Sequence, residues 1–212
     1  MVFLDADDRL LPSALELGVR YLAARPGCAF VAGRHRYIDA AGAPMPAGEE
    51  QRLVESDHYL ELLRSNFIGC PATVMYRREA LDTVGGFTVG VRGVEDYDLY
   101  LRIARDFPIH CHREVIAEYR VHGANMSGNL PTMRAGVVGV LRAHLELARG
   151  DRRREEASRA GMRFQEDKYD REELVARARI HARAPTGGWR RGTRWFCCAV
   201  TRGPSSNTRG AR

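Results

Sequence analysis

The chain begins with an apolar run that ends in three carboxylates, Val2-Phe3-Leu4-Asp5-Ala6-Asp7-Asp8. The apolar residues predict a buried strand, with the acids at its end. Carboxylates held close together raise one another's pKa, and a divalent cation, which prefers oxygen ligands, would remove that penalty. In open α/β sheets ligands bind beyond the carboxyl ends of the strands, where these acids would lie. The alternative is an acidic turn in which Asp8 caps the following helix.

Two later segments carry further candidate groups. One places a Glu-Asp pair at the start of an amphipathic helix, Val94-Glu95-Asp96-Tyr97-Asp98-Leu99-Tyr100-Leu101-Arg102. The other runs from a strand into a polar loop, Glu118-Tyr119-Arg120-Val121-His122-Gly123-Ala124-Asn125-Met126-Ser127. Acids in a first helical turn also favour the helix dipole, and a lone His is often structural. Neither segment is therefore specific by itself.

In this order, and with residues 71–87 between them, the segments resemble family 2 glycosyltransferases of the GT-A fold. The resemblance covers residues 2–127. It implies inverting, metal-dependent transfer of a sugar from a nucleotide-sugar donor to a hydroxyl of a saccharide or lipid-linked acceptor. Polysaccharide or glycoconjugate synthesis is the implied process, and residues 71–87 look like the family's acceptor-side segment.

The resemblance also implies a role for each candidate residue. Asp96 matches the general base that deprotonates the acceptor hydroxyl, with Glu95 beside it on the acceptor side. Asp7 matches the direct ligand of a Mn²⁺ or Mg²⁺ ion, and Asp5 would contact the metal or the ribose. His122 stands where related enzymes place a His near the metal and the donor diphosphate. We expect the amides at the helix N-terminus to lower the pKa of Asp96.

The sequence departs from the family in one respect. The acids begin at Asp5, so the first strands and the nucleotide-base pocket of such enzymes have no counterpart here. We therefore expect a truncated transferase with little activity of its own. The alternative is a non-catalytic remnant that acts as a binding module or pseudoenzyme.

Other site classes and roles fit less well. A haloacid-dehalogenase-type phosphohydrolase needs Thr or Val where Arg9 stands, and a later Lys near acids, whereas the single Lys168 lies in a charged helix. A calcium loop needs Gly where Leu10 stands. We expect Arg120 in a buried or half-buried ion pair and Asp98 in solvent.

Composition adds the cellular setting. The five cysteines show no Cys-x-x-Cys spacing, which favours free thiols in a reducing cytoplasm. No signal peptide and no membrane-spanning run are visible. Residues 1–130 carry a net charge of −4 and residues 131–212 one of +10. The basic part indicates a solvated helix with a disordered tail, or peripheral contact with anionic lipid at the inner membrane face or with nucleic acid; we expect no specific nucleic-acid partner.

The expected fold class is α/β, a partial GT-A (nucleotide-diphospho-sugar transferase) sandwich followed by C-terminal helices and a disordered basic tail. The domains would be a truncated GT-A domain at 1–130, a helical extension at 131–183 and the tail at 184–212. Besides the opening strand, the apolar pattern predicts strands at 28–39, 70–76 and 110–121. It predicts helices at 11–24, 56–64, 78–84, 95–105, 132–149 and 151–183. In the first helix we expect one apolar stripe, made by Leu11, Leu15, Val19 and Leu22.

Overall fold

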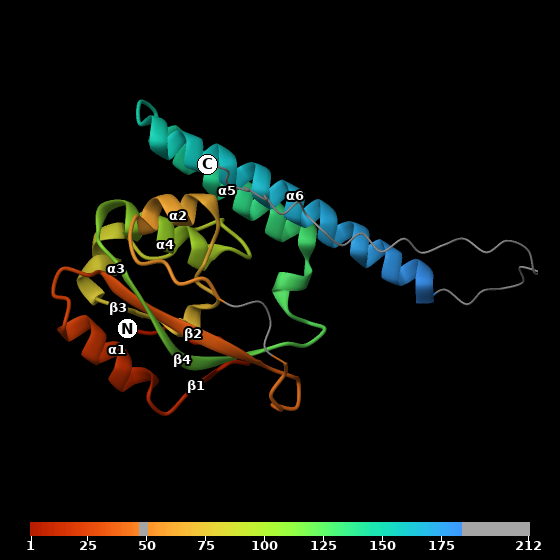
Figure 1. The fold of residues 1–212 in the computed structure, drawn as a ribbon, viewed down its shortest axis with the longest axis horizontal. Coiled ribbons are helices and arrows are strands. Elements are labelled where there is room, and N and C mark those ends of the chain that lie inside the picture. The colour runs from red at the N-terminus through yellow and green to blue at the C-terminus, as the bar shows by residue number, and fades with distance from the viewer. Residues whose placement is uncertain (47–50, 184–212) are drawn as a thin grey trace, which may run out of the picture.

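A computed structural model describes residues 1–46 and 51–183. These residues form a mixed four-stranded sheet, helices that pack on it, and a long helical hairpin (Figure 1). The strand order is β1-β4-β2-β3. The strands span Arg9–Leu10 (β1), Phe30–Ile38 (β2), Val74–Tyr76 (β3) and His110–Arg120 (β4). The long strands β2 and β4 run parallel at the centre, and the short strands β1 and β3 pair antiparallel at the edges.

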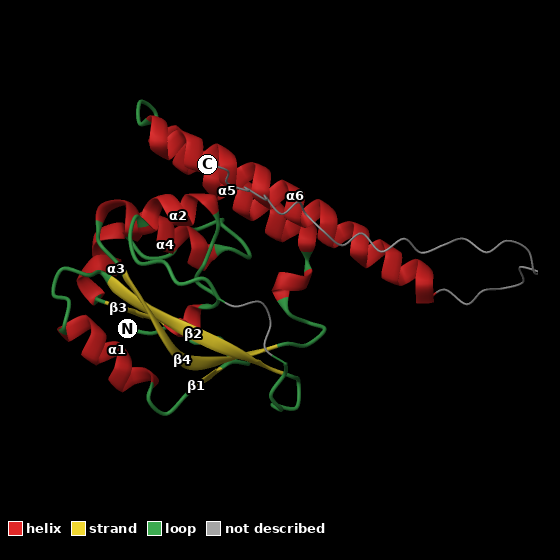
Figure 2. Ribbon diagram, viewed as in Figure 1, coloured by secondary structure: helices red, strands yellow, loops and turns green. Residues whose placement is uncertain are grey.

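The helices confirm most of the predicted boundaries. They span Ala14–Ala23 (α1), His58–Arg64 (α2), Arg78–Val84 (α3), Glu95–Asp106 (α4), Leu130–Leu147 (α5) and Arg152–Arg183 (α6). The helix α1 lies on one side of the sheet and α2 and α4 on the other (Figure 2). The hairpin of α5 and α6 packs beyond them, and α6 lies against α2. Within the described ranges, no helix has both the length and the apolar character needed to cross a membrane.

Alternation along the strands divides the apolar side chains between two cores. Val31 and Met75 pack with Leu22 of α1 on one face. Their strand neighbours Phe30 and Val74 point the opposite way, into the larger core beneath α2 and α4. This is the period-two pattern of a strand that is covered on both faces. Leu99, Tyr100 and Ile103 of the amphipathic helix α4 are fully buried in this larger core.

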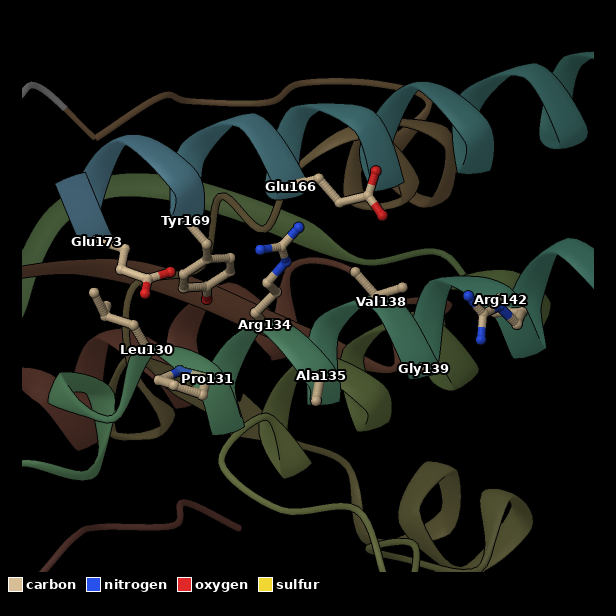
Figure 3. Close-up of a pocket in the computed structure, with 10 residues that line it drawn as sticks. All are labelled: Leu130, Pro131, Arg134, Ala135, Val138, Gly139, Arg142, Glu166, Tyr169 and Glu173. Atoms are coloured by element: carbon tan, nitrogen blue, oxygen red, sulfur yellow. The ribbon is translucent and has the colours of Figure 1, made fainter.

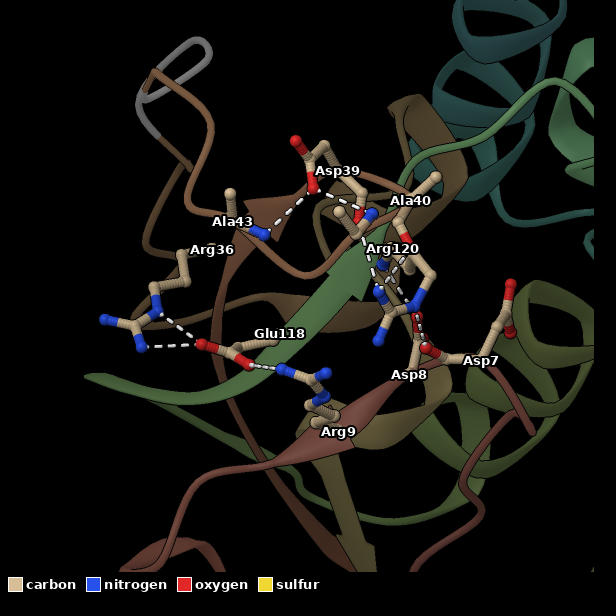
Figure 4. Close-up of polar contacts among 10 residues, drawn as sticks. Asp7, Asp8, Arg9, Arg36, Asp39, Ala40, Ala43, Glu118 and Arg120 are labelled. Carbon is tan, nitrogen blue, oxygen red and sulfur yellow. Dashed lines mark hydrogen bonds and ion pairs between the residues drawn. The ribbon is translucent and has the colours of Figure 1, made fainter.

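One buried acid ties three strands together. Glu118 on β4 accepts from Arg36 on β2 at 2.6 Å and lies 3.6 Å from Arg9 on β1 (Figure 4). The Glu118 carboxylate is buried and both arginines are half exposed, so the buried negative charge is compensated by two cations. The pairing fixes the register of the sheet next to the acidic turn at residues 5–8.

The prediction of a strand at the start of the chain is wrong. Met1 exchanges backbone hydrogen bonds with Tyr76 at 2.7 and 2.8 Å and Val2 forms an isolated bridge to Met75, but no strand continues through Phe3 and Leu4, and the first strand is β1. The side chain of Phe3 packs edge-on against Tyr76 and Phe87, at centroid distances of 5.6 and 4.8 Å. Only the first two residues therefore pair with β3, Phe3 joins an aromatic cluster, and the chain turns at the acids before β1.

The predicted apolar stripe on α1 is confirmed for Leu22 and wrong for Leu15 and Val19. Leu15 and Val19 are 54% and 61% exposed, whereas Ala14, Gly18 and Leu22 are buried. A Cβ at Gly18 would lie 2.6 Å from the Met75 Cε. The helix approaches β3 so closely that small residues form most of its buried face, and hydrophobicity alone does not reveal that face.

One further expectation changes. The predicted strand at 70–76 starts as a single turn of 3₁₀-helix at Pro71–Thr73, where Thr73 donates to the Cys70 carbonyl at 2.7 Å, and only β3 is extended.

The cysteines agree with the prediction of free thiols: Cys28, Cys70 and Cys111 are free in the described part of the chain. The proposed tail at 184–212, with Cys197 and Cys198, lies outside the described residues, and the domain boundaries stay predictions.

Candidate active site

The four principal candidates come together at one cleft. Asp5, Asp7, Asp96 and His122 all line a cavity of about 1060 Å³, although they come from three separate segments. Glu95 lines it as well. The sheet contributes Tyr37 and Tyr119 to the wall, and the hairpin closes another side. The sequence order of the motifs therefore translates into one shared site.

A single arginine holds the acidic turn against the sheet. The Arg120 Nε donates to the Asp7 carbonyl at 2.8 Å, and Nη1 donates to the carbonyls of Asp39 and Ala40 at 3.1 Å each (Figure 4). The expected ion pair of Arg120 is therefore wrong, because its guanidinium binds backbone oxygens. Its own backbone N–H donates to Asp8 Oδ1 at 2.9 Å. These contacts fix where the carboxylates of the turn project.

Asp7 is paired with His122. The His122 Nε2 lies 2.8 Å from Asp7 Oδ2, and His122 Nδ1 lies 3.2 Å from the Ala124 backbone N. Since Nδ1 accepts the Ala124 N–H, the ring hydrogen sits on Nε2 and is donated to Asp7. This hydrogen bond lowers the pKa of Asp7. Asn125 accepts from the His122 backbone N–H and donates to the Arg120 carbonyl, which keeps the loop in place.

Asp5 and Asp7 are the residues predicted to hold a divalent ion. Burial raises the pKa of Asp5, and the carboxylates of Asp7 and Glu95 raise it further. Among the described residues no group of three or more His, Cys, Asp or Glu side chains could hold a metal. Two carboxylates would therefore need further oxygen ligands, which in magnesium sites are often substrate phosphates.

Asp8 belongs to the turn and not to the cavity. It is 8% exposed and its Oδ2 has no hydrogen-bond partner among the described residues. Burial raises its pKa in spite of the Arg120 N–H. It does not cap the following helix either, since α1 begins six positions later at Ala14. Its carboxyl connects the turn to β4 by accepting the Arg120 N–H.

Asp96 lies in the cleft at the start of α4, with a raised pKa. It lies in the first turn of α4, and its Oδ1 accepts from the Tyr97 N–H at 2.7 Å. We expected helix amides to lower its pKa, and this is wrong: burial outweighs them and, with Glu95 and Asp5 nearby, raises the pKa to about 6. A carboxylate with such a pKa can both accept and release a proton at cellular pH.

Comparison with known proteins gives a fold and no family. No protein-family model matches the chain, and no curated protein matches it. A solved structure, S. aureus TarS 1-349, is similar with a TM-score of 0.51 and 12% identity, over 76% of this chain and 45% of that one. TarS is a glycosyltransferase. The fold is therefore glycosyltransferase-like. The chain spans less than half of the TarS structure, and a similarity with such low sequence identity shows only the fold.

In this glycosyltransferase-like fold, the sequence interpretation missed residues that the hairpin brings to the cleft. Gln165, Lys168 and Tyr169 of α6 line it, with Met133 and Val137 of α5. Lys168 was interpreted only as part of a charged helix. Nothing in its local sequence marks it, because its position depends on how α6 packs: a Cβ at Gly161 would lie 1.9 Å from the Leu63 carbonyl oxygen.

A second cavity, of about 440 Å³, lies between α5 and α6 (Figure 3). Arg134 and Arg142 of α5 border it, with Glu166 and Glu173 of α6. Arg134 is already paired with Asp170 at 2.6 Å. The cavity is lined by none of the predicted site residues, all of which lie at the larger cleft.

Proposed function

We propose that the cleft transfers a sugar from a nucleotide-sugar to an acceptor hydroxyl, with inversion at the anomeric carbon. The observation that carries this proposal is the shared cleft of Asp5, Asp7, Asp96 and His122 in a glycosyltransferase-like fold. Partners of this reaction are a nucleotide-sugar donor and a saccharide or lipid-linked acceptor.

Asp96 is the general base of the proposed reaction. The acceptor oxygen attacks the anomeric carbon while the bond from that carbon to the donor diphosphate breaks. The diphosphate leaves with the bonding electron pair, and the acceptor proton passes to Asp96. A single displacement of this kind inverts the anomeric configuration. Glu95 lies next to the base on the acceptor side and raises its pKa.

Asp5 and Asp7 would hold the Mn²⁺ or Mg²⁺ ion, which when bound neutralises charge on the leaving diphosphate. His122 donates to Asp7 and keeps that carboxylate ionised and oriented. Arg120 holds the backbone of the same turn. These residues thus prepare an oxygen-rich surface at the donor end of the cleft before any ligand arrives.

The test is transfer by the 212-residue chain, for which we expect a low rate, with Mn²⁺ and a panel of nucleotide-sugars and acceptors. Asp96→Asn should reduce turnover by roughly 10²–10⁴-fold, since it keeps the shape and removes the base. The matched control is Asp82→Asn, an exposed acid on α3 that should leave turnover unchanged. NMR of the product should show the inverted anomer.

Three results would count against the proposal. Full turnover by Asp96→Asn would exclude Asp96 as the base, and a retained anomer would exclude a single displacement. Donor binding by the unaltered chain without any turnover would instead support the non-catalytic alternative, a binding module.

A further inference from the structure

The loop between α3 and α4 reaches the cleft but is poorly held by its own residues. Gly85, Gly86, Gly90 and Gly93 all have positive φ angles, between 68° and 92°. Val89 at its tip is 99% exposed. Such a segment has many accessible backbone conformations, so its position requires contacts from outside the loop.

Those contacts come from one arginine on α4. Arg102 donates from Nη1 to the Val84 carbonyl at 2.8 Å and from Nη2 to the Gly86 carbonyl at 2.6 Å. Its Nε donates to Asp98 Oδ2 at 2.8 Å. Three donors of one planar group thus bind three fixed acceptors, two of which lie at the start of the loop.

Asp98 completes the arrangement. Its Oδ2 also accepts from the Thr88 hydroxyl at 2.7 Å, so Asp98 reaches the loop on the far side of Phe87. Asp98 is 8% exposed, which corrects the expectation that it lies in solvent. An ordinary i,i+4 ion pair on a helix would involve only Arg102 and Asp98. Here the pair also binds two loop carbonyls and the Thr88 hydroxyl.

Phe87 is the residue held between these contacts. It lines the cleft, and its ring packs 4.8 Å from Phe3, which lines the cleft as well. Asp96 lines the same cleft. Phe87 is 41% exposed, so much of its surface is available to a ligand.

We propose that Arg102, Asp98 and Thr88 are positioning residues that hold Phe87 as a wall of the acceptor subsite, in the cleft that the proposed base Asp96 also lines. The assignment of Phe87 to an acceptor subsite rests on the proposed function, whereas the anchoring of the loop does not. The three residues touch no substrate; they act through the backbone at 84–88. An aromatic wall of this kind suits a sugar ring, which can pack its apolar face against it.

Two pairs of variants test the anchoring. Thr88→Val removes the hydroxyl and keeps the shape of the side chain, whereas Thr88→Ser keeps the hydroxyl. Arg102→Lys keeps the charge but cannot reach three acceptors at once. Its control is Arg105→Lys on the same helix, where Arg105 pairs with the exposed Asp106 at 2.7 Å and touches no loop carbonyl.

Hydrogen exchange of the backbone amides is the first readout. Thr88→Val and Arg102→Lys should exchange roughly fivefold or more faster at 85–94, since one hydrogen bond contributes about that factor. Thr88→Ser and Arg105→Lys should match the unaltered chain. Unchanged exchange in both test variants would overturn the proposal whatever the activity.

Transfer kinetics is the second readout. Thr88→Val and Arg102→Lys should raise the KM for the acceptor about fivefold with the KM for the donor unchanged, and Thr88→Ser should restore it. Equal losses toward donor and acceptor would overturn the acceptor assignment. Absence of transfer in the unaltered chain refutes the proposed function instead, and the exchange measurement then decides the anchoring alone.

Discussion

The ring of His122 donates from Nε2 to Asp7 Oδ2 at 2.8 Å, across a sequence separation of 115 residues. The hydrogen bond from the Ala124 N–H to Nδ1 selects this tautomer. The loop after β4 thereby orients a carboxylate on the turn before β1. A preoriented carboxylate would lose less entropy on binding the proposed cation.

Asp7→Asn should weaken Mn²⁺-dependent binding of nucleoside diphosphates at least about tenfold, because a neutral amide is a poor ligand for a hard cation. Isothermal titration of the chain with UDP, GDP, ADP and CDP, with and without Mn²⁺, measures this. Asp82→Asn is the control with the same chemical change. Unchanged Mn²⁺-dependent affinity in Asp7→Asn would remove Asp7 from the site.

Glu95→Gln should move the pH dependence of transfer to lower pH. A base works only when it is deprotonated, so the rate should fall as the pH drops through the pKa of Asp96, about 6. The Glu95 carboxylate contributes to that raised pKa, and its removal makes Asp96 easier to ionise. The profile of kcat/KM against pH checks the direction. A shift toward higher pH would contradict the electrostatic coupling of the two acids.

Gly161→Ala should destabilise the protein by roughly 1–3 kcal/mol or more, since the new methyl would collide with the Leu63 carbonyl. Gly139→Ala on α5 is the matched control: a Cβ there meets nothing within 4 Å, so helix propensity should raise stability by about 0.5–1 kcal/mol. Urea unfolding measures both. Equal effects of the two substitutions would mean that α6 does not pack closely against α2.

Acid should destabilise the fold through His144. Its side chain is buried, the Tyr59 hydroxyl lies 2.9 Å from its Nδ1, and burial lowers its pKa to about 4. The unfolded chain binds this proton near pH 6.5, so the unfolded state gains protons first as the pH falls. About 3 kcal/mol should be lost between about pH 6.5 and 4. Melting temperatures of His144→Gln should depend less on pH; an unchanged slope would assign the effect to other groups.

Local signals in the sequence account for the parts of the fold that were predicted well. The bounds of α3 followed from the glycines after Val84, because Gly85 ends the helix in the left-handed region. The core face of α4 followed from its helical period. The face of α1 did not, since close packing at Gly18 replaced large apolar residues with small ones.

The site was predicted in the same uneven way. Asp5, Asp7, Asp96 and His122 were named from motif order, and the structure brings them to one cleft, while their roles stay predictions. Asp98 and Lys168 were misjudged. The environment of Asp98 depends on the α3–α4 loop, and that of Lys168 depends on how α6 packs. A local sequence pattern does not predict such tertiary contacts.

The central place of β4 also shapes how the chain reaches its native state. Its pairing with β2 joins residues such as Val31 and His110, and its pairing with β1 joins Arg9 and Glu118. Contacts so distant in sequence are slow to form, because a long loop must close before any of them contributes. The helices can form early, but the acidic turn meets His122 only after β4 has docked. We expect ligand-binding competence to be acquired late in folding, together with the last strand pairing.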